Sequence, residues 1–174
     1  MNKTEYVFRR YKDDDLDTIY KAYEDYIIDD VQPYYNVGCG MIKSEFEESI
    51  QKHSRRSNYP PIVADKDDRA IGVVNVSYKR ANKYHTLEVY MWEKKHLTKP
   101  VLHVMVEKLM NKGTFAYLLL EVPGYDLELK KAADELGLQN TGTIPMFLRH
   151  GEELHDKYFY VTNSEFWNAK GKDI

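Results

Sequence analysis

The stretch Leu87–Lys112, LEVYMWEKKHLTKPVLHVMVEKLMNK, decides the fold that the sequence predicts. Its first part, Leu87–Trp92, is rich in β-branched and aromatic residues, and its apolar side chains are spaced two apart, which predicts a half-buried strand. Its last part carries apolar residues at helical spacing, and Gly113 stands where a helix commonly ends. The basic loop over residues 94–99 therefore leads into a helix N-terminus, where backbone N–H groups and nearby cations favour phosphate.

The composition is that of a soluble globular protein. The chain has 174 residues, of which 43% are hydrophobic and 30% are charged, and its net charge is -3. This length suits one domain, which we expect over residues 1–167, followed by a frayed polar tail over 168–174. The negative net charge argues against a nucleic-acid partner.

The cysteine content and the hydropathy indicate a cellular location. A single cysteine, Cys39, excludes an internal disulfide framework and fits a reducing cytoplasm. The first residues are too polar for a signal peptide, and no apolar run approaches membrane-spanning length. We therefore expect a cytoplasmic protein without a membrane partner.

The patterns in the first half of the chain predict two helices and three strands. A short strand over Tyr6–Arg9 precedes a helix whose apolar stripe begins at Leu16. Ser44 opens a capping box for a second helix. Two strands, Ile62–Ala64 and Ile71–Val76, flank the turn DKDDR as a hairpin, and the strand at residue 87 continues this antiparallel sheet.

The second half predicts a buried strand, a helix and a closing hairpin. Tyr117–Val122 is a continuous apolar run, as in a strand that is covered on both faces. Asp126–Leu136 predicts a helix, and Thr143–Arg149 with Lys157–Thr162 predict the hairpin. The whole order predicts an α+β fold, with a mixed, mostly antiparallel sheet of about seven strands, helices on both faces and one parallel pair near the middle.

These pieces, in this order, resemble the GNAT superfamily of acyl-CoA-dependent N-acetyltransferases over roughly residues 6–162. FRRYKDDDLDTIYKAY is similar to the family's first strand and helix, and IVADKDDRAIGVVNV to its second and third strands. DLELKKAADELGL resembles the family's helix that ends in Gly-aromatic, and RHGEELHDKYFYV its final hairpin. The resemblance implies a GNAT-like fold and acetyl-CoA as the co-substrate.

In that family the loop after the fourth strand carries Arg/Gln-x-x-Gly-x-Gly/Ala, whose amides hold the pyrophosphate, while the strand edge pairs with the pantetheine. Leu97 and Lys99 replace the two glycines here, while the loop lysines attract phosphate. The resemblance implies that the strands separate after residue 91. It also implies these cofactor-binding residues: Val89, Met91, Lys94, Lys95, His96, Leu97, Thr98, Lys99 and Asp126.

The acceptor amine needs a base, and the departing thiolate needs a proton or a stabilising charge. On the central strand we expect Glu88 to act as the base, directly or through water, with His85 as a residue that can share this role. Many family members carry a tyrosine acid on the helix after the fifth strand, where this chain has Ala133. Tyr158 and Tyr160 on the last strand are the candidates to replace it.

Two functions remain open from the sequence. The first is an acetyl-CoA-dependent N-acyltransferase that moves an acetyl group to a primary amine of a small molecule or protein. The second is a catalytically inactive GNAT-like binding protein that has lost normal CoA binding, because the loop glycines and the usual tyrosine are absent. Tyr34 and Tyr35 lie where the family places substrate contacts, and the apolar final strands allow a homodimer. The histidines do not cluster at metal-ligand spacing, and the acidic run Asp13–Asp15 is explained by helix capping, so we expect no metal.

Overall fold

The computed structural model describes residues 6–28, 42–48, 62–64, 67–79, 84–110, 117–163 and 165–167. In chain order its elements are β1 (Val7–Arg9), η1 (Asp13–Asp15), α1 (Leu16–Ile28), β2 (Ile62–Ala64), β3 (Ala70–Lys79), β4 (Tyr84–Met91), η2 (Lys94–His96), α3 (Lys99–Met110), β5 (Tyr117–Pro123), α4 (Leu127–Leu136), β6 (Gln139–His150) and β7 (Glu153–Thr162). A further helical segment spans residues 43–48.

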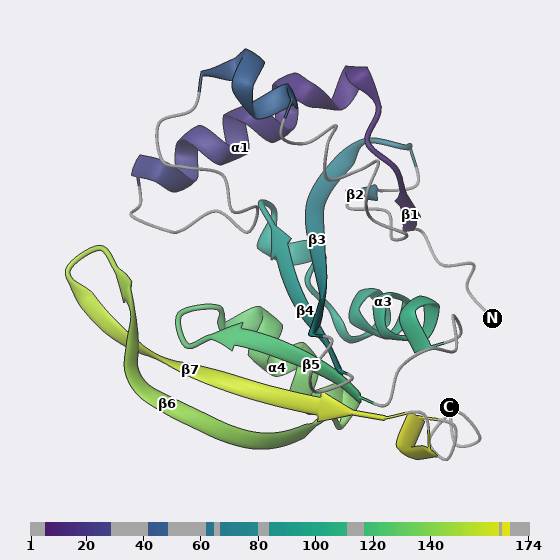
Figure 1. Ribbon diagram of the computed structural model, residues 1–174, viewed down its shortest axis with the longest axis vertical. Coiled ribbons are helices and arrows are strands. Elements are labelled where there is room, and N and C mark those ends of the chain that lie inside the picture. The colour runs from purple at the N-terminus through teal and green to yellow at the C-terminus, as the bar shows by residue number, and fades with distance from the viewer. Residues whose placement is uncertain are drawn as a thin grey trace.

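The described strands form one seven-stranded sheet in the order β1-β2-β3-β4-β5-β7-β6 (Figure 1). Neighbouring strands are antiparallel except β4 and β5, which are parallel and joined through α3. A helical crossover is the usual way to make such a parallel pair. The structure thus confirms the predicted α+β fold with a mixed, mostly antiparallel sheet.

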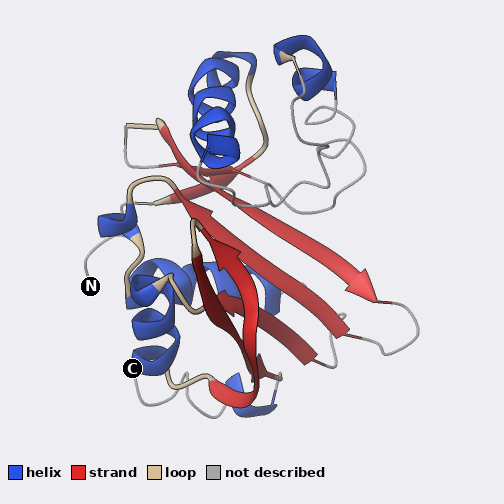
Figure 2. Ribbon diagram, turned by 90° about the vertical axis from the view of Figure 1, so that its left-hand side faces the viewer, coloured by secondary structure: helices blue, strands red, loops and turns tan. Residues whose placement is uncertain are grey.

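Helices cover both faces of the sheet. Alternate residues of β4 therefore pack into two different cores, one on each face. Figure 2 shows the helices in two groups, one above the strands and one to their lower left. The larger core joins β4 and β5 to α3 and α4, and includes Leu87, Val89, Met91, Leu102, Met105, Leu118, Leu120, Leu129 and Ala133. The smaller core joins α1 and segment 43–48 to β3, through Ile19, Phe46, Ala70 and Val73. Tyr90, which lies between Val89 and Met91 in the chain, packs against the smaller core.

The structure corrects several predicted details. The second helix already includes Lys43, so Ser44 lies within its first turn; the N–H of Ile42 instead donates to the Glu45 carboxylate at 3.4 Å. β6 and β7 are longer than the predicted hairpin strands. In β5, Leu119 is half-buried, so the strand is not fully covered on both faces as predicted. The tail over 168–174 lies outside the described residues, and the single domain over 1–167 stays a prediction.

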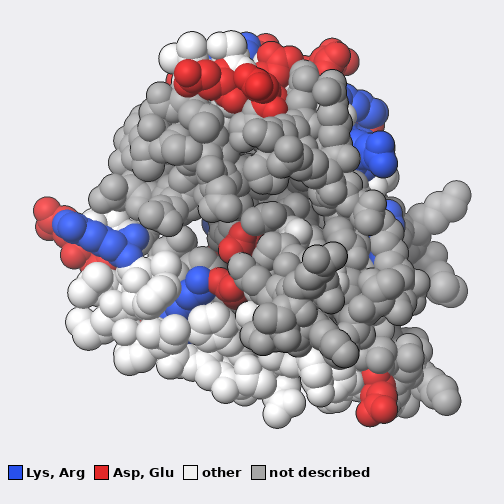
Figure 3. Space-filling view, viewed as in Figure 1, with Lys and Arg blue, Asp and Glu red and all other residues white. Residues whose placement is uncertain are grey.

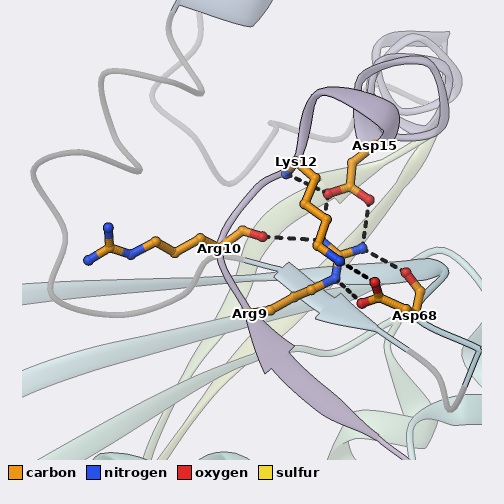
Figure 4. Close-up of polar contacts among 5 residues, drawn as sticks. All are labelled: Arg9, Arg10, Lys12, Asp15 and Asp68. Atoms are coloured by element: carbon orange, nitrogen blue, oxygen red, sulfur yellow. Dashed lines mark hydrogen bonds and ion pairs between the residues drawn. The ribbon is translucent and has the colours of Figure 1, made fainter.

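A partly buried ion-pair network connects β1 to the turn before α1 and to the β2–β3 turn (Figure 4). The Arg9 guanidinium donates to both carboxylate oxygens of Asp15, at 2.6 and 2.7 Å, and to the Asp68 carboxylate at 2.5 Å. The backbone N–H of Lys12 also donates to Asp15, at 2.8 Å. The hydrogen bond to Asp15 is the main reason that the pKa of Arg9 lies above its ordinary value. Asp15 is only 6% exposed, so this acidic residue has a structural role.

This network predicts different effects for two neighbouring aspartates. Asp15→Asn should lower the free energy of unfolding by about 3 kcal/mol, because it removes the buried one of the two carboxylates that pair with the mostly buried Arg9 guanidinium. Asp14→Asn is the matched control, since Asp14 is exposed, and we expect it to cost less than about 1 kcal/mol. Urea denaturation followed by circular dichroism measures both, and equal losses would contradict the role given to Asp15.

Candidate functional site

β4 and β5 separate part-way along their length. Their pairing runs from Tyr84 opposite Tyr117 to Leu87 opposite Leu120 and then stops. Both strands continue, β4 to Met91 and β5 to Pro123, and β4 stays paired with β3 as far as Met91. The separation therefore begins after Leu87. The expectation that the strands separate only after residue 91 was wrong. On this edge of β4, backbone N–H and C=O groups of alternate residues face the opening instead of a strand.

The loop after β4 is closed by its own hydrogen bonds. The N–H of His96 donates to the carbonyl of Glu93 at 3.0 Å, that of Leu97 to Lys94 at 2.8 Å, and that of Thr98 to His96 at 3.0 Å. The carbonyl of Thr98 accepts from Leu102 at 3.0 Å, so Thr98 stands at the N-cap of α3. The amides of residues 96–98 are thus used inside the loop.

Leu97 is turned inward from the loop. Its side chain is 4% exposed and belongs to the larger core. Its φ of -83° is ordinary for a residue with a side chain, so this loop does not need a glycine there. The glycine-free sequence is accommodated because the chain makes the 3-10 turn η2 and turns Leu97 inward.

Carboxylates pair with two of the three loop lysines, Lys94 and Lys95. Lys95 and His96 contact the Glu93 carboxylate, at 2.7 and 3.2 Å, and Arg69 lies 3.8 Å from it. The hydrogen bond from Lys95 is the largest cause that lowers the pKa of Glu93 below its ordinary value. Among the described residues, Lys99 is the loop lysine with no carboxylate within 4.0 Å.

Lys94 and Asp126 connect the two diverging strand ends. The Lys94 ammonium lies 2.5 Å from the Asp126 carboxylate and 5.4 Å from the centre of the Tyr90 ring. Asp126 follows β5 and is the N-cap of α4, where its other oxygen accepts from the N–H of Leu129 at 3.2 Å. The Asp126 side chain is 1% exposed, whereas that of Lys94 is 38% exposed. Two residues predicted to contact the cofactor thus contact each other.

Glu88 lies where the strands begin to separate. It is the first residue of β4 after the last pair with β5, and it lies opposite Asn75 of β3. Its neighbours Leu87 and Val89 belong to the larger core, so the half-buried Glu88 side chain points to the other face of the sheet. The structure therefore places the predicted base beside the opening.

Tyr158 and Tyr160 are not brought together with Glu88. Both belong to or pack against the larger core, on the face that α4 covers. Tyr160 is 1% exposed, its hydroxyl donates to the Asp134 carboxylate at 2.7 Å, and burial raises its pKa. The Lys130 ammonium lies 5.2 Å from the centre of the Tyr158 ring.

Two further positions from the sequence analysis are buried, and three others lie outside the described residues. His85 is 6% exposed, lies opposite Leu118 on the α3–α4 side of the sheet, and has a pKa lowered by burial. Ala133 is fully buried in the larger core. Tyr34, Tyr35 and Cys39 lie outside the described residues.

Sequence reasoning missed Glu121 and Lys157. Glu121 is the first residue of β5 after the last pair with β4, and it forms an ion pair with Lys157 of β7. The two side chains are 18% and 21% exposed. The signal in the sequence was a single carboxylate within the otherwise apolar run YLLLEV.

A search of the described residues for metal sites and membrane spans finds neither. No group of three or more His, Cys, Asp or Glu side chains in these ranges is arranged to hold a metal ion. No helix among them combines the length and the apolar character needed to cross a bilayer.

The geometry predicts how two substitutions at Asp126 differ. Asp126→Asn keeps the N-cap and lets Lys94 turn toward water, so we expect a loss of about 1 kcal/mol in the free energy of unfolding. Asp126→Ala also removes the cap and should cost about 2 kcal/mol. Urea denaturation measures both, and an alanine variant as stable as the asparagine variant would show that the cap contributes nothing.

Comparisons with known proteins identify the fold. No protein-family model matches the sequence, and no curated protein matches it either. Among solved structures, spermidine N-acetyltransferase of Vibrio cholerae in complex with CoA and spermine superposes with a TM-score of 0.74 at 14% identity, over 95% of this chain and 99% of that one. A dodecameric structure of the same enzyme has a TM-score of 0.74 at 13% identity, covering 94% and 96%.

A third solved structure, a GNAT-family acetyltransferase from Bacillus anthracis, has a TM-score of 0.69 at 11% identity, over 92% of this chain and 96% of that one. The separated parallel strands, the basic loop and the helix after it thus occur within the same architecture as in these enzymes. The chain has the fold of the GNAT acetyltransferases.

Proposed function

We propose that the chain is an acetyl-CoA-dependent N-acyltransferase that moves an acetyl group to a primary amine of a small molecule or protein. The observation that carries this proposal is the opening between β4 and β5, which begins beside Glu88 and leads to the N-terminus of α3. A thioester lying in the opening meets a carboxylate at one end and a helix dipole with lysines at the other. Those are the groups needed to deprotonate an amine and to hold a phosphate.

The edge of β4 beyond its last pair with β5 is our proposed contact for the pantetheine. The amide groups of the pantetheine form hydrogen bonds with the backbone of Val89 and Met91, as an added strand would. The phosphates lie at the start of α3, near the exposed Thr98 hydroxyl and the Lys99 ammonium. Because the amides of residues 96–98 are occupied, the lysines carry more of the phosphate binding than backbone groups do. The Lys94 ammonium also contributes to phosphate binding when it leaves the Asp126 carboxylate and pairs with a phosphate oxygen instead.

Glu88 is our proposed base. Its carboxylate takes a proton from the acceptor ammonium, directly or through water. The amine nitrogen then attacks the carbonyl carbon, a C–N bond forms, and the C–S bond breaks to release the CoA thiolate. We assign no acid role to Tyr158 or Tyr160, because both lie on the other face of the sheet from Glu88. A thiol has a pKa of about 8.5, so the thiolate leaves readily, and it takes up, directly or through water, the second proton that the acylated nitrogen loses as the amide forms.

The structural neighbours suggest acceptors to try first. The Vibrio cholerae enzyme is a spermidine N-acetyltransferase with a structure in complex with CoA and spermine, so polyamines are reasonable acceptors for this chain. A dodecameric structure of that enzyme is known. Self-association of this chain, including the predicted homodimer, is therefore a hypothesis to test. A cytoplasmic location likewise stays a prediction.

One observation favours the alternative, a catalytically inactive binding protein with this fold. The loop amides are hydrogen-bonded within the loop, and carboxylates already pair with Lys94 and Lys95. A loop in this condition suits a ligand with less negative charge than a diphosphate. Measuring CoA binding separates the two functions.

Calorimetric titration with acetyl-CoA tests the first function directly. We expect a Kd in the micromolar range, about -8 kcal/mol, that weakens as salt rises. Lys99→Glu should weaken binding about tenfold or more, because it reverses the charge of the loop's unpaired lysine. Lys131→Glu on the exposed side of α4 is the control and should bind normally. No detectable binding at millimolar acetyl-CoA would refute the transferase and support the alternative.

Release of the CoA thiol in the presence of spermidine and simpler amines tests the base. Glu88→Gln should lower kcat by about 10²- to 10⁴-fold and leave the Kd for acetyl-CoA within about twofold. Glu128→Gln is the control, since Glu128 is exposed on α4. An unchanged kcat would exclude Glu88 as the base.

A further inference from the structure

The diverging ends of β4 and β5 each lie against a strand that is held from its other side. β4 is paired with β3 as far as Met91, and β3 is paired in turn with β2. β5 is paired with β7 as far as Pro123, and β7 is paired in turn with β6. Figure 3 shows a hollowed surface above the β6–β7 hairpin, in the region where Figure 1 draws these diverging ends. The width of the opening therefore depends on how closely each strand end approaches its outer neighbour.

Gly72 allows the end of β4 to lie close against β3. It is opposite Met91, the last residue of β4. A Cβ atom at position 72 would lie 2.6 Å from the carbonyl oxygen of Tyr90 and 3.2 Å from the Cα of Met91, and it would also overlap the Met91 sulfur. A new rotamer of Met91 relieves only the overlap with sulfur, because the other two atoms belong to the backbone. A larger residue at position 72 therefore displaces the end of β4 from β3, toward the opening.

Gly124 allows the end of β5 to lie equally close against β7. It follows Pro123, and its N–H donates to the carbonyl of Asp156 on β7 at 2.7 Å. A Cβ atom at position 124 would lie 2.7 Å from the same carbonyl oxygen and 3.1 Å from the Asp156 nitrogen. Asp156 is held on its other side, since its carboxylate accepts from the N–H of Met146 in β6 at 3.1 Å. A side chain at position 124 therefore displaces the end of β5 from β7.

A third contact spans the opening itself. Lys94 follows β4 and Asp126 follows β5, and the ammonium lies 2.5 Å from the carboxylate. This ion pair limits how far the two ends separate, whereas the glycines let each end lie back against its outer neighbour. The separation of the strands is thus bounded from inside by the ion pair and from outside by two close backbone contacts.

We propose that Gly72 and Gly124 are positioning residues that set the width of the opening for the pantetheine and its thioester. The inference rests on the proposed function, in which the backbone of Val89 and Met91 holds the pantetheine. A Cβ atom at 2.6 or 2.7 Å from a carbonyl oxygen must move about 0.7 to 0.8 Å to reach ordinary contact, which begins at 3.4 Å. A misplacement of about 1 Å is enough to cost a reaction as much as a hundredfold in rate. Alanine at either position therefore narrows the opening and weakens the ligand that occupies it.

Calorimetric titration of the whole chain with acetyl-CoA and with ADP tests this role. ADP carries the diphosphate of CoA without the pantetheine, so it reaches the α3 end and does not fill the opening. Gly72→Ala and Gly124→Ala should each raise the Kd for acetyl-CoA about tenfold and leave that for ADP within about twofold. Gly142→Ala is the matched control, because Gly142 is exposed and a Cβ atom there meets nothing within 4 Å. Acetyl-CoA binding that is unchanged in both test variants, or equally weakened in the control, overturns the proposal.

The comparison of the two ligands separates positioning from a purely structural role. Overpacking alone lowers the folded fraction, which circular dichroism measures, and leaves the ratio of the two Kd values as in the wild type. If Gly72→Ala does not fold, Gly124→Ala decides, because Gly124 is only half-buried and lies beyond the end of its strand. Equal weakening of acetyl-CoA and ADP also overturns the proposal.

Crystal structures of the variants distinguish failure of this inference from failure of the proposed function. The distance between the Cα atoms of Met91 and Pro123 should shorten by about 0.5 Å or more in both test variants and stay unchanged in Gly142→Ala. If the distance shortens but the wild-type chain binds no acetyl-CoA, the transferase is wrong and the role of the glycines in the opening stands. If the wild-type chain binds acetyl-CoA and the distance is unchanged, the role of the glycines is wrong and the transferase stands.

Discussion

The loss of pairing between β4 and β5 is the constraint on which the rest of the site depends. Backbone N–H and C=O groups need hydrogen-bond partners, and an edge left open in the middle of a sheet is costly unless water or a ligand fills it. The other edge of each strand remains hydrogen-bonded: β4 stays paired with β3 as far as Met91, and β5 stays paired with β7 as far as Pro123. The opening is therefore a feature of the architecture itself, and Glu88 and Glu121 are the first residues beyond the paired stretch.

The order of the elements was predictable because each has a local signal. Alternation marked the strand at Leu87, apolar spacing marked α3, and Gly137 with positive φ ends α4 as the sequence indicated. Patterns that depend on one or two residues were less secure. Ser44 offered a capping box, yet the helix already includes Lys43, because the carboxylate of Glu45 satisfies the N–H of Ile42.

The site was predictable only in part, because side-chain partners depend on contacts between distant segments. Lys94 and Asp126 are 32 residues apart, and nothing local shows that each satisfies the other. Tyr160 was a candidate acid because of its chemistry, but its strand parity turns it toward Asp134 on α4. Glu121 was overlooked because the apolar run around it was interpreted as a strand buried on both faces. A carboxylate in such a run is costly to bury without a partner, and Lys157 is that partner.

The two ends of the opening hold different charged groups. At the α3 end, loop lysines are held by Glu93 and Asp126, so an incoming phosphate competes with carboxylates that are already in place. At the other end, Glu88 follows the last pair of β4 with β5, and Glu121 is paired with Lys157. Under the proposed function, the anionic cofactor binds at the α3 end, and the acceptor amine approaches the thioester from the end where the proposed base lies.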